Sequence, residues 1–321
     1  MKHLLRNAVF ALIFIALLSA PLYAQEEAIS KTFKNINQLD VRIVSGDCII
    51  EAGKGNEVTV DLVYDYSPDC FEPEFSADGN RLRLRERFER YRNCSGYSEW
   101  TITVPKGIDI DFSSASGDLS LTGCEGEYFL ESASGRIEIE SCQGEFEIEN
   151  ASGRVEIMDS DGEFSIDNAS GRIRMEDVSG RFELDNASGN IDVVNVRGEF
   201  EVDNASGDIE AVEILIEDES NFDTASGDVI ITLAKSPEHD VALESASGDV
   251  VLNYGGNKVV GFFEFTARAD RGRIISPYKF DVEEEYERGN RVYERKSFTR
   301  GKGEPEILLR TSSGRAELEL K

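Results

Sequence analysis

Hydrophobic and polar positions alternate along most of this chain, and a glycine interrupts the alternation at regular intervals. From Gly117 to Gly207 every ninth residue is a glycine. After Gly135, for example, Ile137 and Ile139 alternate with charged residues, which is the period-two pattern of a strand with one buried and one wet face. The pattern therefore predicts one short strand for every nine residues.

Two such strands form a unit of eighteen residues that is repeated with little change. Successive copies read ASGRIEIESCQGEFEIEN (133–150), ASGRVEIMDSDGEFSIDN (151–168), ASGRIRMEDVSGRFELDN (169–186) and ASGNIDVVNVRGEFEVDN (187–204). One copy has too few large apolar side chains to close a core, whereas stacked copies bury them against one another. The repeat predicts a parallel β-solenoid, with equivalent residues of neighbouring coils about 4.8 Å apart.

Stacking of the coils places equivalent side chains in columns. The expected aromatic column is Tyr128, Phe146, Phe164, Phe182 and Phe200. The expected amide column, which would hydrogen-bond along the stack, is Asn150, Asn168, Asn186 and Asn204. An antiparallel meander would share the alternation, but it would leave a broad apolar face with no helical segment to cover it. We therefore expect an all-β, β-helix-like solenoid with about 18 residues per coil and irregular β caps at both ends.

The regular repeat covers only the middle of the chain. We expect a signal peptide at 1–24, an N-terminal β cap with irregular first coils at 25–112, regular coils at 113–253 and a C-terminal β cap at 254–321. The segment 41–51 is a degenerate copy of the repeat, and residues 312–320 return to it. Such caps hide the open edges of the first and last coils.

The N-terminal residues have the composition of an export signal. Lys2 and Arg6 precede an apolar run from Ala8 to Leu18, and the small residue Ala24 stands before a polar stretch, as in a secretory signal peptide. The run is short for a membrane span, and a retained anchor is the alternative. We expect no transmembrane segment in the mature chain and a location outside the cytoplasm: periplasmic, cell-surface or secreted.

The chain is strongly acidic. Its formal net charge of −29 becomes −31 when Lys2 and Arg6 leave with the signal peptide. A surface this negative argues against nucleic acid as a partner and against binding to anionic membranes through the overall field. With 40% hydrophobic residues the chain is nevertheless globular.

The five cysteines permit disulfides in an exported protein but leave one thiol unpaired. Cys70 and Cys94 flank a predicted hairpin and are the expected pair. Cys124 and Cys142 occupy the same position in adjacent coils, within reach of a disulfide if their side chains can turn. Cys48 lies in a predicted strand and is expected to be free.

Several motifs together resemble a known family. The Ala-Ser-Gly-Asp phrases at 225–228 and 246–249, the lead-in Val-Pro-Lys-Gly at 104–107 and the N-terminal signal resemble a bacterial family of exported domains of unknown function known as "putative adhesins". The resemblance covers nearly all of the mature chain through the reiterated S-A-S-G-[DR]-[IV] motif. It implies a β-solenoid fold and a cell-envelope setting, and it brings no catalytic residues with it.

Side chains suited to catalysis are scarce. His239 is the only histidine that would remain in the mature chain, so no Ser-His-Asp or Cys-His arrangement and no histidine metal site can be built. The serines of the Ala-Ser-Gly corners are expected to form turns. We expect no catalytic residues and no cofactor.

An outward column of carboxylates is the main alternative candidate for a metal or catalytic site. Its members are Glu131, Glu149, Asp167, Asp185 and Asp203. Like charges one strand spacing apart repel one another. We expect the column to be solvated or paired with Arg136, Arg154 and Arg172, just across the Ala-Ser-Gly corner. A structural calcium ion is the weaker alternative, because the glycine-rich calcium turn of nonapeptide β-rolls is missing. A glycan-cleaving β-helix would also use acidic clusters, but no coil is singled out as an active site.

The segment 81–92 is the least like its surroundings because it is rich in arginine. Arg81, Arg83, Arg85 and Arg87 project from one face of a predicted strand. They either pair with the protein's own carboxylates, which we favour, or bind an anionic polymer or peptide. A binding surface here would include the nearby Tyr91, Tyr97 and Trp100.

Together these features favour an exported, non-enzymatic β-solenoid. We expect it to act as a rigid, adhesin-like interaction module at the cell envelope, presenting columns of like side chains to an unknown protein or glycan partner. A glycan-active β-helix enzyme and a calcium-stiffened spacer are the alternatives.

Overall fold

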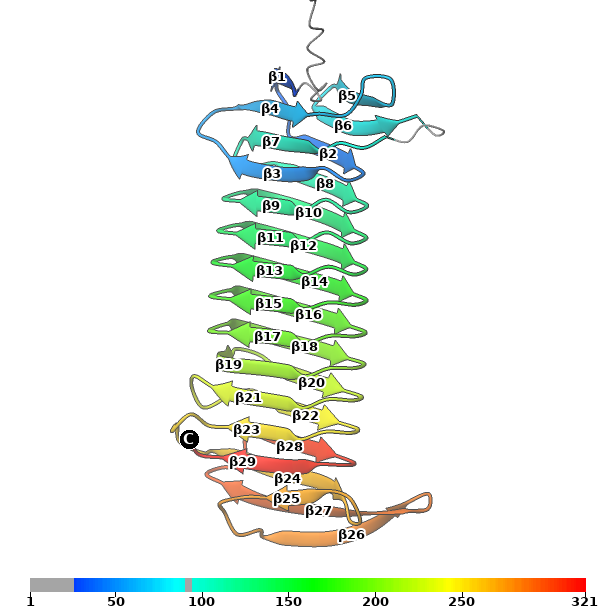
Figure 1. Cartoon of the computed structure of the whole chain (residues 1–321). Coiled ribbons are helices and arrows are strands. Elements are labelled where there is room, and N and C mark those ends of the chain that lie inside the picture. The colour runs from blue at the N-terminus through cyan, green and yellow to red at the C-terminus, as the bar shows by residue number, and fades with distance from the viewer. Residues whose placement is uncertain (1–25, 90–93) are drawn as a thin grey trace, which may run out of the picture.

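The chain winds into a long stack of two-stranded coils (Figure 1). The computed structural model describes residues 26–89 and 94–321; the predicted signal peptide at 1–24 lies outside these residues. Equivalent strands of successive coils pair in parallel and in register, so that Phe146 lies opposite Phe164 and Phe164 opposite Phe182. The predicted all-β parallel solenoid, with eighteen residues per regular coil, is confirmed.

Each coil contributes one strand to each of two parallel sheets, which we call sheet A and sheet B. The strands of sheet A in this part of the stack are β9 (Leu119–Thr122), β11 (Ile137–Glu140), β13 (Val155–Met158), β15 (Ile173–Glu176), β17 (Ile191–Val194), β19 (Ile209–Ile216), β21 (Val229–Leu233) and β23 (Val250–Asn253). Those of sheet B are β8 (Asp109–Ser114), β10 (Glu125–Ser132), β12 (Gln143–Asn150), β14 (Asp161–Asn168), β16 (Ser179–Asn186), β18 (Arg197–Asn204), β20 (Ser220–Thr224) and β22 (Val241–Ser245). The core lies between the two sheets, where the inward side chains of both meet.

The predicted aromatic column fills the core of the regular coils. Ring centroids are 4.6 Å apart between Phe146 and Phe164 and 5.6 Å apart between Phe164 and Phe182, and both pairs are stacked. Phe222 is in register with Val202, and its ring continues the aromatic stack beyond the predicted members, 5.5 Å from Phe200. The rings are buried, so this column contributes much of the apolar area that the fold removes from water.

The amide column links neighbouring coils through the backbone. The Asn150 side chain donates to the carbonyl of Gly135 in the preceding coil at 3.3 Å and accepts from the N–H of Gly153 at 3.0 Å. Asn204 donates to the carbonyl of Gly189 in the same way at 2.9 Å. The expected contact along the stack therefore runs from side chain to main chain, and it fixes the Ala-Ser-Gly corner.

Glycine is required where successive turns stack directly on one another. A Cβ atom at Gly144 would lie 1.8 Å from the carbonyl oxygen of Gly126, and one at Gly153 would lie 1.8 Å from that of Gly135. Real Cβ atoms do not approach so closely, so the strand spacing of the stack depends on these positions having no side chain.

The N-terminal cap builds its coils out of chain order. Its strands are β1 (Glu27–Lys34), β2 (Gln38–Ile43), β3 (Asp47–Ala52), β4 (Glu57–Tyr64), β5 (Phe71–Asp78), β6 (Arg81–Phe88) and β7 (Ser98–Val104). Strands β2 and β3 stack on β8 and β9 as one more coil, which contains the degenerate repeat at 41–51. Strands β6 and β7 stack in parallel on β2 and β3. Antiparallel β5 then covers β6, and β4 with β1 covers β7.

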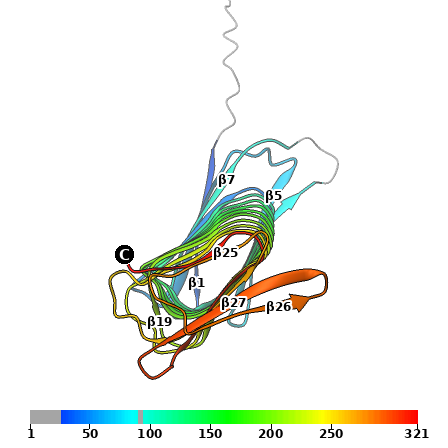
Figure 2. The same cartoon turned by 90° about the horizontal axis from the view of Figure 1, so that it is seen from below.

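The C-terminal cap is also built from strands that stack out of chain order. Its strands are β24 (Gly261–Arg268), β25 (Arg273–Ile275), β26 (Val282–Arg288), β27 (Arg291–Arg300), β28 (Glu306–Thr311) and β29 (Arg315–Glu319). The last two strands insert between β22–β23 and β24–β25, so the C-terminus lies on the side of the stack rather than at its end (Figure 1). The β26–β27 hairpin extends beyond the outline of the coils (Figure 2).

Only one disulfide joins the described cysteines. It connects Cys70 to Cys94, with their Cα atoms 5.8 Å apart, in the cap between β4 and β7. Cys48, Cys124 and Cys142 are free and buried. Among the described residues, no helix is long and apolar enough to cross a membrane.

Candidate functional site

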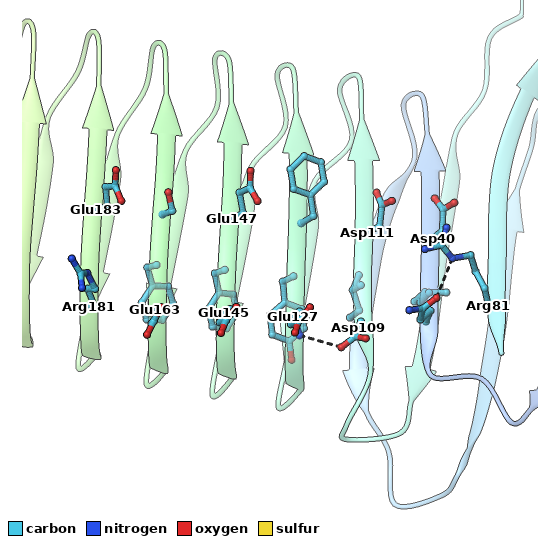
Figure 3. Close-up of a pocket in the computed structure, with 18 residues that line it drawn as sticks. Asp40, Arg81, Asp109, Asp111, Glu127, Glu145, Glu147, Glu163, Arg181 and Glu183 are labelled. Atoms are coloured by element: carbon cyan, nitrogen blue, oxygen red, sulfur yellow. Dashed lines mark hydrogen bonds between the residues drawn. The ribbon is translucent and has the colours of Figure 1, made fainter.

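Three side-chain columns on the outward face of sheet B run along the solenoid axis. They pass through β12 at Glu145, Glu147 and Glu149, and the strand register continues each of them from coil to coil. Figure 3 shows two of the columns, one through Asp109, Glu127, Glu145, Glu163 and Arg181 and one through Asp40, Asp111, Glu147 and Glu183. These two line a depression of about 500 Å³ together with the half-buried ring of Phe129.

The third column is the most uniform, and we call it the acidic column. It consists of Glu131, Glu149, Asp167, Asp185, Asp203 and Asp223, which are successive in-register neighbours from β10 to β20. With the alanines of the Ala-Ser-Gly corners it lines a groove of about 960 Å³ along the stack, which we call the corner groove. Five rung spacings of about 4.8 Å make the acidic column about 24 Å long.

The acidic column lacks countercharges. Among the residues that the structure describes, none of its six carboxylates has a basic group within ion-pair distance. Burial, followed by the charges of Asp203, Asp167 and Glu183, raises the pKa of Asp185. Burial, followed by the charges of Glu244 and Asp203, raises the pKa of Asp223. Both shifts have the direction expected of like charges held one rung apart.

The predicted pairing of this column with corner arginines is wrong. Arg136 pairs with Glu138 at 3.1 Å and Arg154 pairs with Glu156 at 3.1 Å, both on the outward face of sheet A. Arg172 reaches Asp192, also on sheet A, at 3.2 Å. The chain turns from one sheet to the other at the Ala-Ser-Gly corner. Residues that are close in sequence across this corner therefore find their partners on different faces.

The arginines of β6 occupy the N-terminal ends of the three columns. Arg81, Arg83 and Arg85 lie in register with Gln38, Asp40 and Arg42 of β2, which in turn lie in register with β8. Arg85 donates to the carboxylate of Asp40 at 2.6 Å. Burial raises the pKa of Asp40, but the hydrogen bond and charge of Arg85 outweigh it and lower the pKa overall.

The remaining arginine contacts are also internal. Arg83 lies 3.9 Å from Asp40 and 4.0 Å from Asp78, and Arg87 pairs with Glu74 on β5. In the structure, Arg83, Arg85 and Arg87 therefore pair with the protein's own carboxylates, which is the interpretation that we favoured for this segment. These arginines offset the negative charge at one end of the outward face of sheet B.

Of the aromatic residues predicted beside them, the two that the structure describes do not share a surface. Trp100 is fully buried, because it shares the inward parity of β7 with Ile102 and Val104, so its assignment to a binding surface is wrong. Tyr97 is 42% exposed, and its hydroxyl donates to Glu26. Tyr91 lies outside the described residues.

Arginines also close the C-terminal end of the acidic column. The next rung after Asp223 is Glu244, which pairs with its own in-register neighbour Arg310 at 2.7 Å. Two rungs beyond Arg310, Arg295 pairs with Glu284 and lies over the ring of Tyr286, 5.8 Å from its centroid. Sequence reasoning missed this arrangement because the C-terminal strands join the stack out of order.

The described residues contain no group of three or more His, Cys, Asp or Glu side chains placed to hold a metal ion. Each coil contributes only one carboxylate to the acidic column, and the same side-chain type returns in every coil. The geometry supplies a long surface of repeated negative charge.

Comparison with known proteins identifies the family. The model of the Toastrack family, a domain of unknown function designated DUF4097, matches residues 36–261. The chain belongs to the Toastrack family. No curated protein matches the chain.

Solved structures similar to this Toastrack chain are distant from it. One is a "putative cell adhesion protein" from Clostridium sporogenes, with 10% identity, a TM-score of 0.23, and coverage of 92% of this chain and 100% of that one. A "putative adhesin" from Bacteroides fragilis has 13% identity, a TM-score of 0.35 and coverage of 92% and 98%. A "putative lipid binding protein" from Parabacteroides distasonis has 12% identity, a TM-score of 0.41 and coverage of 92% and 97%.

Proposed function

We propose that this protein is an exported, non-enzymatic interaction module of the cell envelope that holds a partner against the outward face of sheet B. The observation that carries the proposal is the acidic column: six carboxylates without a basic partner among the described residues line one continuous groove. A rigid surface of unneutralised charge is a strong basis for partner recognition, because complementary charge supplies both steering and specificity.

The repetition of the surface supports binding over catalysis. Catalysis needs one set of groups whose geometry and pKa values differ from their surroundings. Here the outward side chains recur from Glu131 to Asp223 at equal spacing. A glycan-active enzyme would require one coil to differ from the others, and the described acidic column repeats the same kind of group from coil to coil. A calcium-stiffened spacer would need several carboxylates grouped in each coil, whereas each coil contributes one carboxylate to the acidic column.

The test compares two variants with the same change of net charge. The face-B variant carries Glu131→Gln, Glu149→Gln, Asp167→Asn, Asp185→Asn and Asp203→Asn. The face-A variant carries Glu138→Gln, Glu140→Gln, Glu156→Gln, Glu176→Gln and Glu210→Gln on the opposite sheet. The fraction of each protein that is retained with the envelope of the producing cells is measured by immunoblotting.

We expect the wild type and the face-A variant to be retained and the face-B variant to be released. Equal retention of all three proteins would contradict a role for the outward face of sheet B. Release of both variants would show that only the overall charge matters. Thermal unfolding of the purified variants confirms that each one is folded.

A further inference from the structure

We propose that Cys124 and Cys142 form a second disulfide, which joins two neighbouring coils when the folding chain meets a disulfide oxidant. The inference goes beyond the proposed function, because both side chains lie in the core and neither belongs to the outward face of sheet B. The structure shows the two cysteines as free thiols, so the proposal assigns them an oxidised state in addition.

The two cysteines occupy equivalent positions in successive coils. Each directly precedes a strand of sheet B, and the residues that follow them are in-register partners in β10 and β12. Each also follows a residue in the left-handed region, Gly123 with a φ of 71° and Ser141 with a φ of 56°, so the chain enters both strands through the same kind of turn. Equivalent residues of paired strands lie about 4.8 Å apart, within the range of about 4.4–6.8 Å between Cα atoms that a disulfide spans.

The two thiol groups interact inside the core, where both residues are fully buried. Sγ of Cys142 lies 3.3 Å from the carbonyl oxygen of Glu140 in its own coil and 3.6 Å from that of Leu121 in the preceding coil. A hydrogen bond between the thiols, together with burial, raises the pKa of Cys124, and the same bond lowers the pKa of Cys142 against the effect of burial. Cys142 is therefore the thiol that ionises first, and the thiolate is the attacking species in disulfide exchange.

The surroundings of the pair are more polar than the rest of the core. Tyr128 is the one tyrosine of the aromatic column, and its buried hydroxyl has no hydrogen-bond partner among the described residues. Burial raises the pKa of Tyr128, and the neighbouring Cys124 and Cys142 add to the shift. The next two coils have Ser160 and Val178 at the position of the cysteines. A cluster of two thiols and one hydroxyl is therefore particular to this pair of coils.

The oxidant is a disulfide, either a small molecule or the active disulfide of a thiol–disulfide oxidoreductase. The bond between Cys70 and Cys94 needs such an oxidant as well. The thiolate of Cys142 attacks the oxidant, forms a mixed disulfide and releases one thiol. The thiolate of Cys124 then attacks the sulfur of Cys142, which forms the cross-link and releases the second thiol. The two cysteines thereby lose two protons and two electrons, and the two thiols of the reduced oxidant receive them.

The test follows both thiols through oxidative refolding of the full-length protein. The reduced, unfolded protein is refolded with oxidised and reduced glutathione, the remaining thiols are blocked with N-ethylmaleimide, and the chain is digested with trypsin without reductant. Cleavage after Lys106, Arg136 and Arg154 places the two cysteines on separate peptides. We expect mass spectrometry to find the peptides 107–136 and 137–154 joined, with a mass two hydrogen atoms below their sum.

Thermal unfolding shows whether the bond ties the coils together. Reduction should lower the melting temperature of the wild type by several degrees more than that of Cys124→Ser, because both proteins lose the bond between Cys70 and Cys94 and only the wild type loses the second cross-link. Cys48→Ser is the matched control, since Cys48 is also free and buried, and it should respond to reduction as the wild type does.

Four outcomes would overturn the inference. Blocking groups on both Cys124 and Cys142 after oxidative refolding would show that the thiols do not join. A glutathione adduct on Cys142 without the cross-link would show that the stack prevents the second exchange. A cross-link from Cys48 to either cysteine would show that the pair is wrongly assigned. An equal response of the wild type and Cys124→Ser to reduction would show that no bond ties the coils. If the serine variant does not fold, the peptide map of the wild type decides alone.

Discussion

The indole nitrogen of Trp100 donates a hydrogen bond to Oε1 of Glu86 across 3.1 Å inside the N-terminal cap. Glu86 occupies an inward position of β6 and is 8% exposed, and no basic side chain of the described residues pairs with it. Its other oxygen accepts from the N–H of Val44 at 2.7 Å, and the hydroxyl of Ser98 donates to Oε1. This carboxylate therefore ties β6, β7 and the turn after β2 together where the chain order is inverted.

We predict that Glu86→Ala lowers the free energy of unfolding by about 3 kcal/mol, because it leaves several buried donors without an acceptor. Trp100 is the only tryptophan of the chain, so its fluorescence during denaturant unfolding reports this cap directly. Glu86→Gln, which keeps one acceptor oxygen, should cost less. A Glu86→Ala protein with the stability of the wild type would contradict the role given to this carboxylate.

Phe164→Ala should lower the free energy of unfolding by about 3–5 kcal/mol, because it removes one fully packed ring from the aromatic column. Phe164 is 2% exposed and stacks on a ring on either side. Ser170→Ala, in an exposed corner, is the control and should change stability by less than about 0.5 kcal/mol. Chemical denaturation measures both. A cost below about 1 kcal/mol for Phe164→Ala would refute the column.

Gly144→Ala should cost more than about 3 kcal/mol, because its Cβ atom would meet the carbonyl oxygen of Gly126 and force two coils apart. Gly107→Ala is the matched control, since a Cβ atom there meets nothing within 4 Å. Thermal unfolding of the two variants should therefore differ by many degrees. Similar melting temperatures would show that the stack tolerates side chains at its turns.

Asp185→Asn should stabilise the protein at pH 7 by a few tenths of a kcal/mol, a small effect because water screens this exposed carboxylate. The pKa of Asp185 is raised in the folded state, so its charge costs stability above that pKa, and the cost disappears as the pH falls below the ordinary value of 3.8. The advantage of the variant should therefore vanish near pH 3.

Asp40→Asn provides the opposite case for the same pH series. The pKa of Asp40 is lowered in the folded state, so its charge contributes stability above pH 3.8 that is lost as the pH falls through the folded pKa. The variant should be less stable than the wild type at pH 7. Unfolding curves at several pH values check both signs, and a stabilising effect of Asp40→Asn at pH 7 would contradict the Arg85 pairing.

The regular coils could be predicted from the sequence because each of their contacts is a repetition of the same local rule. The glycine spacing fixes the turns, and the alternation fixes which side chains face inward. The neighbours of Phe146, Phe164 and Phe182 therefore follow from the sequence alone. Trp100 alternates in phase with Ile102 and Val104, and this pattern in the sequence indicates that the indole lies in the core.

The caps could not be predicted in the same way because their pairings are non-local and leave the chain order. Nothing near Arg85 in sequence indicates that β6 lies on β2, yet this pairing sets Arg85 against Asp40. Likewise Arg310 joins Glu244 across 66 residues. The acidic column was visible in the sequence, whereas its arginine-closed ends depend on strand order.

Carboxyl footprinting in the producing cells tests most directly whether the outward face of sheet B holds a partner. Carbodiimide labelling of Glu149, Asp167 and Asp185 is compared by mass spectrometry between the purified protein and the protein in intact cells, with Glu140 and Glu210 of sheet A as internal references. We predict that labelling of the acidic column falls several-fold in cells while the references stay unchanged. Equal labelling of the acidic column in both settings would contradict the proposal.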